Sequence, residues 1–261
     1  MSEPGAETGR DVRRAARAGF DGFTVGRAPG FVQANLVLLP APDADAFEDF
    51  CGGNPAACPL IARGAPGDPS PAALGGDLDL RTDLPAYLVH EGGRVRRAAG
   101  IADAWRDDLV PFAIGCWFGA EAALRRAGVR LRHVELGIQG PLFRTDRAAV
   151  PAGALEGPLV VSMRPFADRD VDTVVATTAR LPLSHGAPLH RGDPADLGIR
   201  EPERPDWGEP LATEPGETAL YWGCGLTALA ALQAAALPFF VTHAPGAMLV
   251  TDLVEETAPC P

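Results

Sequence analysis

Runs of apolar residues and amphipathic segments alternate along the chain without a regular βαβ period. Apolar runs bounded by turn residues predict strands at five places: Phe31–Leu39, Pro158–Arg164, Ala219–Gly223, Phe239–His243 and Ala247–Leu253. Alternating positions predict a further strand over Leu131–Leu136 and a hairpin, Ala86–His90 with Arg94–Arg97, around Glu91-Gly92-Gly93.

Helical spacing of apolar residues predicts four helices: Asp11–Ala18, Asp43–Phe50, Asp168–Arg180 and Leu226–Leu237. A fifth helix follows the buried segment 109–119 and stops at Gly128, and Asp43 or Asp45 is expected to cap the helix at 43–50. Two segments rich in Gly and Pro, 51–80 and 183–204, read as irregular loops. This mixture favours a mixed α/β (α+β) fold over a doubly wound parallel sheet.

Composition excludes several classes of protein. A net charge of −11 argues against nucleic acid or an anionic membrane as a partner. All 23 basic residues are arginine, so a Schiff-base lysine for pyridoxal phosphate and a Walker A loop are both ruled out. None of the four serines lies in G-x-S-x-G, which excludes the usual nucleophile of an α/β-hydrolase.

The five cysteines form no C-x-x-C motif and predict reduced thiols. No apolar signal segment is visible at the N-terminus, and the longest apolar stretch, 226–241, is interrupted by Gln233 and Pro238. We therefore expect a soluble, cytoplasmic protein.

Histidines supply the first candidate chemistry. His185 and His190 share one loop, and His243 ends a predicted strand. They are candidates for acid–base catalysis or metal binding, the alternative being loop histidines that only hydrogen-bond to the backbone. His133, on a predicted strand, and His90, in the hairpin, are expected to be structural or exposed.

A turn between a strand and a helix is the second candidate for chemistry. Gly223-Cys224-Gly225 matches the start of G-x-G-x-x-A and would point backbone N–H groups at an anion such as a substrate carboxylate. The rest of a dinucleotide-binding unit is missing, so NAD is not expected. Cys224 is either a nucleophile whose thiol pKa the helix lowers or a small buried residue.

Arginines and amides at apolar positions are the third candidate for chemistry. Arg81 lies beside Asp83, while Arg144 and Arg164 each follow an apolar run. A buried arginine needs a partner, which is either an Asp or Glu or a bound acid. Gln33 and Asn35 lie within a predicted buried strand and need partners for the same reason.

Several of these motifs, in this order, resemble the hydro-lyase family that is also called the D-glutamate cyclase family. The resemblance spans nearly the whole chain. It rests on Ala28–Leu36, Cys58-Pro59, Asp79–Asp83, Trp105–Asp108, Ile114–Cys116, Arg132-His133, Arg144-Thr145, Val160–Pro165, His185–Pro188 and Thr242–Gly246.

The resemblance implies a three-layer αβα main domain from residues 1–110 and 205–261, with a smaller two-layer domain from 111–204. It also implies a hydro-lyase, with cyclisation of D-glutamate to 5-oxo-D-proline and water as the associated reaction, and it transfers no defined catalytic residues. The chain departs from the usual family pattern at 139–146, at 226–229 and at Ala247, where family members commonly have a histidine. We expect these changes to alter the substrate, in a specialised pathway, with neutral drift as the alternative.

The resulting hypothesis is a dehydrating lyase or cyclase acting on a small carboxylic or amino acid. His185 or His243 would be the acid and base, with Asp83 orienting the proton. Carboxylate and hydrogen-bonding contacts would come from Arg81, Arg164, Arg144, Gln33, Asn35, Ser162 and the Gly223–Gly225 turn.

Three alternatives remain at this point. The first is a non-catalytic binding protein for a small organic acid, and the second is a metal-assisted hydrolase or lactone-opening enzyme using Mg²⁺ or Mn²⁺. The third is a scaffold subunit. No cofactor is otherwise expected, and the sequence leaves open whether the chain forms a homo-oligomer.

Overall fold

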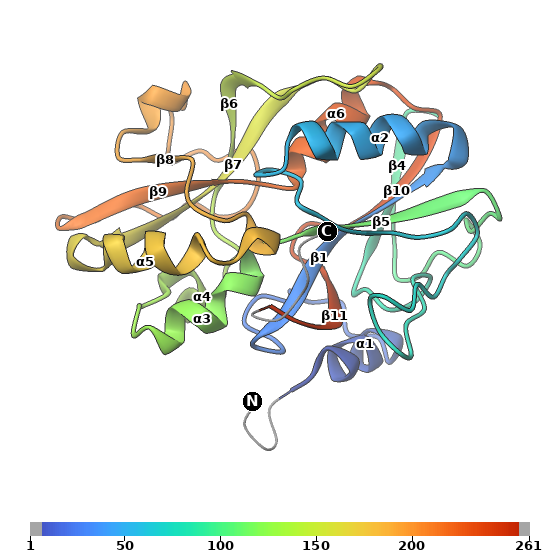
Figure 1. Cartoon of the computed structure of the whole chain (residues 1–261), viewed down its shortest axis with the longest axis horizontal. Helices are drawn as coiled ribbons and strands as arrows, with labels where there is room; N and C mark the ends of the chain where they lie inside the picture. Colours follow the sequence, from blue (N-terminus) through green and yellow to red (C-terminus); the bar gives the residue numbers. More distant parts are fainter. Residues whose placement is uncertain (1–6, 256–261) are drawn as a thin grey trace.

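The computed structural model describes residues 7–255, which form two antiparallel sheets with helices packed on them (Figure 1). The larger sheet has the order β2-β5-β1-β10-β3-β4, with β11 also paired to β1. Its strands are β1 (Phe31–Pro40), β2 (Leu60–Arg63), β3 (Tyr87–Glu91), β4 (Arg94–Ala98), β5 (Leu109–Gly115), β10 (Phe239–His243) and β11 (Leu249–Val254).

The smaller sheet has the order β6-β7-β9-β8. Its strands are β6 (Leu142–Ala148), β7 (Pro158–Ala167), β8 (His190–Arg191) and β9 (Glu217–Gly223). The α-helices are α1 (Gly9–Arg17), α2 (Ala41–Gly53), α3 (Glu121–Arg126), α4 (Arg132–Leu136), α5 (Val171–Thr178) and α6 (Leu226–Ala234). Four short 3₁₀ segments are η1 (Trp117–Ala120), η2 (Asp168–Asp170), η3 (Pro182–Ser184) and η4 (Pro194–Leu197).

Both faces of the larger sheet are buried at its central strands β5, β1 and β10, which explains why β1 reads as an almost continuous apolar run. Val37 and Leu39 pack with α2 and α6, which lie side by side over one face (Figure 1). Leu36 and Leu38 pack on the opposite face, where irregular segments within 74–105 cover the sheet. This face is thus covered mainly by loops, whereas the expected αβα arrangement has helices there.

The smaller sheet is also covered on both sides. Helices α3 and α5 pack with Leu220 and Trp222 on one face, and η4 packs with Met163 and Tyr221 on the other. Two sheets with helices confirm the predicted mixed α/β class. The larger sheet draws on residues 31–115 and 239–254 and the smaller on 142–223, while the division into domains at 110 and 205 stays a prediction.

Most predicted elements are confirmed, but the strand expected over 131–136 is wrong, because these residues form α4. Leu131 and Val134 both pack into the core beside α3 and α5, and a spacing of three places them on one helical face. The predicted cap at Asp43 or Asp45 is also wrong, since α2 starts after Pro40 without a side-chain cap. Sequence reasoning missed β6, and it missed β2 inside a segment read as loop.

No helix in the described part of the chain is long and apolar enough to span a bilayer. The four described cysteines, Cys51, Cys58, Cys116 and Cys224, are free thiols, as expected. Cys260 lies outside the described residues.

Buried ion pairs fasten α1 to the larger sheet. The Arg13 side chain is fully buried and donates to Val250 O (2.8 Å), Asp77 and Asp252. The Asp83 carboxylate is also fully buried, and it accepts hydrogen bonds from Arg17 Nε (2.5 Å) and Nη2 (2.6 Å). Asp83 therefore does not orient a catalytic histidine, as the sequence suggested, because its oxygens are occupied by the α1 arginines.

This network predicts that Asp83→Ala destabilises the protein by about 3–5 kcal/mol, because it removes the fully buried carboxylate that pairs with Arg17 and lies beside the buried Arg13. Chemical denaturation measures the change. The exposed pair of Arg204 and Glu201 provides the control, since Glu201→Ala should cost no more than about 1 kcal/mol. An Asp83→Ala protein with unchanged stability would contradict the assignment.

Candidate active site

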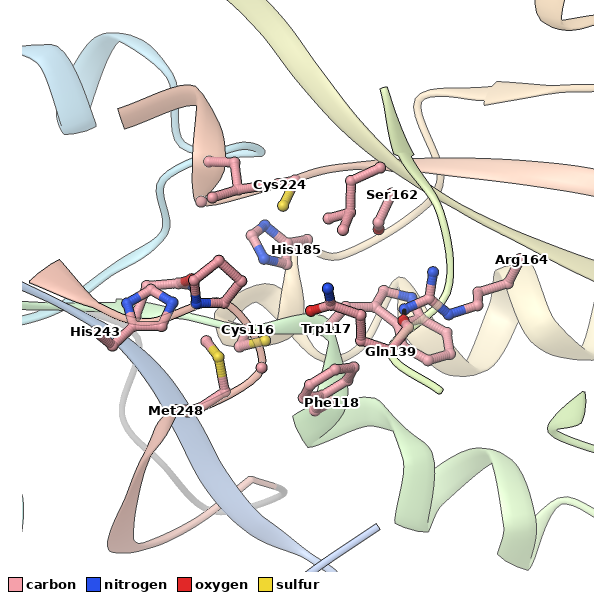
Figure 2. Close-up of a pocket in the computed structure, with 16 residues that line it drawn as sticks. Cys116, Trp117, Phe118, Gln139, Ser162, Arg164, His185, Cys224, His243 and Met248 are labelled. Atoms are coloured by element: carbon pink, nitrogen blue, oxygen red, sulfur yellow. Dashed lines mark hydrogen bonds between the residues drawn. The ribbon is translucent and has the colours of Figure 1, made fainter. Parts of the chain in front are cut away.

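A pocket lies where the two sheets meet, enclosing about 490 Å³ of space that includes its open mouth. It gathers residues far apart in the sequence (Figure 2). Seven of the predicted site residues line it: Asn35, Ser162, Arg164, His185, Cys224, Gly225 and His243. They come from β1, β7, the segment after η3, the turn between β9 and α6, and the end of β10.

His185 is held as a neutral imidazole with one free nitrogen. Its Nδ1 lies 2.9 Å from Ala56 O. A carbonyl only accepts, so Nδ1 carries the hydrogen and Nε2 keeps its lone pair. Burial lowers the pKa of His185 to about 4, although the bond to Ala56 acts in the opposite direction.

Backbone geometry around His185 depends on two glycines. His185 itself has φ 72°, a left-handed conformation uncommon for a residue with a side chain, and Gly186 follows at φ 64°. A Cβ on Gly223 would lie 2.5 Å from Ala56 O. Glycine at 223 is therefore what lets the Ala56 carbonyl approach the strand end and orient the His185 ring.

His243 is the second histidine in the pocket and is also neutral near pH 7. Its Nδ1 lies 3.5 Å from Leu36 O, a long contact, and burial lowers its pKa to about 4. In Figure 2 its ring lies at the opposite end of the pocket from Arg164, with His185 between them.

Arg164 is a buried cation with no carboxylate partner in the described part of the chain. Its Nη1 donates to Met163 O (2.7 Å) and its Nη2 to Gln139 O (2.5 Å), while Nε has no partner. Burial lowers its pKa to about 10, so it stays charged at neutral pH. A Cβ on Gly140, whose φ is +78°, would lie 2.8 Å from Nη1. An unpaired buried charge is costly, so this site favours an anion.

Asn35 packs against the turn before α6. Its Nδ2 donates to Gly115 O (2.7 Å), and a Cβ on Gly225 would lie 2.6 Å from that nitrogen. Gly225 is thus required for close packing between β1 and the turn. The Asn35 amide donates to backbone carbonyls of β5. Its partner is therefore neighbouring backbone, which is one of the two possibilities, backbone or ligand, that the sequence left open.

Of the two alternatives for Cys224, the structure favours the small buried residue over the nucleophile with a lowered thiol pKa. Burial raises the pKa of Cys224 to about 11, outweighing the hydrogen bond from the Leu226 backbone. Burial likewise raises the pKa of Cys116, a second thiol lining the pocket, to about 12. Both thiols are protonated at neutral pH, which disfavours a cysteine nucleophile.

Other predicted site residues lie elsewhere. Arg81 pairs with Asp79 (2.8 Å), Gln33 bonds with Thr24 Oγ1 (2.8 Å), and Arg144 lies over the Trp207 ring with half its side chain exposed. None of these three lines the pocket, and neither does Gly223, which supports it from behind. Local partners close to them in the fold satisfy their polar groups.

The remaining histidines do not line the pocket either. His190 Nε2 contacts Asp193 O (2.9 Å) in its own loop, and His133, on α4 rather than the predicted strand, contacts Glu121 Oε1 (3.0 Å). His90 lies in the β3–β4 hairpin and stacks on Phe240. Among residues 7–255, no group of three His, Cys, Asp or Glu side chains is placed to hold a metal ion.

Sequence reasoning missed several residues that line the pocket, namely Trp117, Phe118, Gln139 and Met248. Trp117 and Phe118 follow a buried segment and read as core, and nothing local marks Gln139. The described lining contains no Asp or Glu. One arginine and two neutral histidines in such surroundings can bind an acid and accept a proton from it.

Relatives place the chain in a family. The sequence model for D-glutamate cyclase matches residues 110–252. A protein named "Putative hydro-lyase" from Methylobacterium radiotolerans is 48% identical over 253 residues, covering 95% of this chain and 93% of that protein. Another of that name from Gluconacetobacter diazotrophicus is 48% identical over 245 residues, covering 93% and 88%.

Among solved structures, a nitrogen repressor-like protein from Methanococcus jannaschii is similar at a TM-score of 0.40 and 10% identity, covering 90% of this chain and 91% of that one. That likeness carries no argument about fold or function. The family match and the identities to the two hydro-lyase relatives are sufficient by themselves: the chain belongs to the D-glutamate cyclase family.

Proposed function

We propose that this protein is a dehydrating lyase or cyclase that removes water from a small carboxylic or amino acid. The observation that carries the proposal is Arg164, a buried cation without a carboxylate partner, in one pocket with two neutral histidines. The hydro-lyase names of the relatives support the same class of reaction.

Cyclisation of D-glutamate to 5-oxo-D-proline and water is the specific reaction we propose to test. Arg164 would bind the α-carboxylate, and His185 Nε2 would accept a proton from the substrate ammonium. The freed amine then attacks the side-chain carboxyl carbon and forms the C–N bond. A carboxyl oxygen leaves as water, carrying the two protons that the nitrogen has lost. Elimination of water from a hydroxy acid needs the same parts, with the base taking a proton from carbon.

All three departures from the usual family pattern border this pocket. Gln139 and Leu142 come from the first segment, Leu226 from the second, and Gly246 and Met248 flank Ala247 in the third. We therefore propose that they adjust the choice of acid while the Arg164 and His185 chemistry is kept.

The reaction is tested by mass spectrometry of D-glutamate, L-glutamate and small hydroxy acids incubated with the protein, with chelator or with added Mg²⁺ or Mn²⁺. Loss of one water from one enantiomer supports the proposal. Thermal stabilisation by an acid that is never converted would point instead to the binding-protein alternative, and metal-dependent ring opening to the hydrolase alternative.

Replacing the buried cation should abolish activity without unfolding the protein. Arg164→Met removes the charge and keeps much of the side-chain volume, so we expect turnover to fall at least about 100-fold, the scale of a lost charged hydrogen bond. Steady-state kinetics and a thermal melt measure the two effects. Arg130→Met, at an exposed pair with Glu135, is the matched control. Activity lost only in proportion to folded protein would refute the role of Arg164.

The free nitrogen of His185 can be tested separately from its structural bond. In His185→Asn the amide can still donate to Ala56 O, while the group at Nε2 is removed. We expect turnover to fall about 100- to 10,000-fold, the usual contribution of a general base, with acid binding retained. Kinetics and calorimetry provide the comparison. A variant with near-normal turnover would exclude His185 as the base.

Neutral buried histidines also predict a pH dependence of stability. Both pKa values are about 4 in the folded protein, against about 6.5 when exposed. The unfolded chain therefore binds protons first, and stability present above pH 6.5 is lost as the pH falls toward 4. Denaturation at several pH values should show a smaller loss for His185→Asn than for the parent protein, and equal slopes would contradict the burial effect.

A further inference from the structure

Three buried side-chain donors bordering the pocket have no hydrogen-bond partner among the described residues. They are Trp117 Nε1, Ser162 Oγ and Arg164 Nε. Each residue is at most 3% exposed. Buried polar groups are almost always hydrogen-bonded, so three such donors around one cavity indicate a ligand that completes them.

The three residues come from both sheets. Ser162 and Arg164 are two apart on β7 and so share a face of the strand. Trp117 begins η1, directly after β5 and Cys116. The Arg164 guanidinium carbon lies 5.0 Å from the centre of the Trp117 ring, which brings the two elements together.

The Trp117 ring is fixed by contacts that leave its N–H unused. The His133 ring meets it edge-on at 5.3 Å between centroids, and the Trp222 ring lies at 5.4 Å. Behind it, His133 Nε2 is 3.0 Å from Glu121 Oε1. The indole is therefore held in position before any ligand binds, which lowers the entropic cost of using its N–H as a donor.

A carboxylate is the ligand that suits this set. Trp117 Nε1 and Arg164 Nε can only donate a hydrogen bond, and Arg164 is also a cation. The Ser162 hydroxyl can donate as well. A carboxylate offers about four acceptor positions on two oxygens and takes charge-assisted bonds from arginine. No described Asp or Glu in the pocket lining supplies those oxygens.

We infer that Trp117 and Ser162, together with Arg164, bind the non-reacting carboxylate of the substrate. This binding directs the reacting end of the substrate toward His185 and His243. The inference rests on the proposed function only for the reaction at the other end of the substrate. Figure 2 shows the arrangement this requires, with Arg164 and His243 at opposite ends and His185 between them.

Indole NMR tests the carboxylate site without any turnover. The chain has four tryptophans, and Trp117→Phe identifies the Nε1–H resonance of Trp117. Titration with acetate, and separately with D-glutamate, should move that resonance downfield as the N–H gains an acceptor. Trp222 Nε1 already donates to Gly186 O (3.1 Å), so its resonance is the internal control. A Trp117 resonance that stays in place up to high acetate and D-glutamate concentrations overturns the inference.

Two conservative variants provide the kinetic test. Trp117→Phe keeps a ring and removes the N–H, and Ser162→Ala removes only the hydroxyl. Each should raise KM, or the Kd for the acid, about 10-fold or more, the scale of a bond to a charged group, with a much smaller change in kcat. Trp105→Phe, at a partly buried position packed against the core on the other face of the larger sheet, is the matched control. A fall in kcat that follows loss of thermal stability, at unchanged KM, would indicate a structural role and overturn the inference.

The outcomes separate this inference from the proposed function. Acetate-induced movement of the Trp117 resonance without dehydration of any acid supports the carboxylate site and counts against the lyase. Dehydration by a protein whose Trp117 resonance does not respond, and whose KM is insensitive to both variants, supports the lyase and rejects the carboxylate site.

Discussion

The desolvated guanidinium of Arg164 is the constraint on which the arrangement of the pocket depends. Water is replaced around it by two backbone carbonyls and the face of an indole. No described carboxylate forms an ion pair with it, although the nearby buried Glu121 acts to raise its pKa. Such a group is stable only if the surrounding backbone is placed to meet it. Gly140 has a left-handed φ and leaves no room for a Cβ beside Nη1, so the chain before β6 is shaped around this one side chain.

Arginines in this protein have two contrasting roles. Arg13 is as buried as Arg164, but it is surrounded by Asp77, Asp83 and Asp252 and fastens α1 to the sheet. Charge compensation from within the chain makes the first arginine structural. The second has no carboxylate in direct contact and lines a cavity, and such a charge favours an external anion. The chemistry of the side chain is the same, and its surroundings decide the role.

The orientation of His185 in the middle of the pocket comes from backbone placement. His185 has a left-handed conformation, and the Ala56 carbonyl that sets its tautomer is near enough only because residue 223 lacks a side chain. Asn35 similarly packs on Gly225. Close approaches of this kind join the ends of β1 and β9 and the loop after η3, so the junction of the sheets is also the site.

The sequence by itself determined most of the strands, the helices with clear period and end signals, and the exclusion of lysine and G-x-S-x-G chemistry. It also singled out Arg164, because an arginine at the end of an apolar run is costly without a partner. It singled out His185 from its loop and His243 from the end of a strand, where functional residues are common. It did not determine the helix at 132–136, where a short pattern fits two periods, or which arginines are paired. Arg81 and Arg144 looked equivalent to Arg164 along the chain. Only the tertiary structure decided between them, because burial, and for Arg144 the contact with Trp207, depend on residues tens of positions away, whereas Arg81 pairs locally with Asp79. The same long-range packing brought Trp117 and Gln139 to the pocket without any local signal.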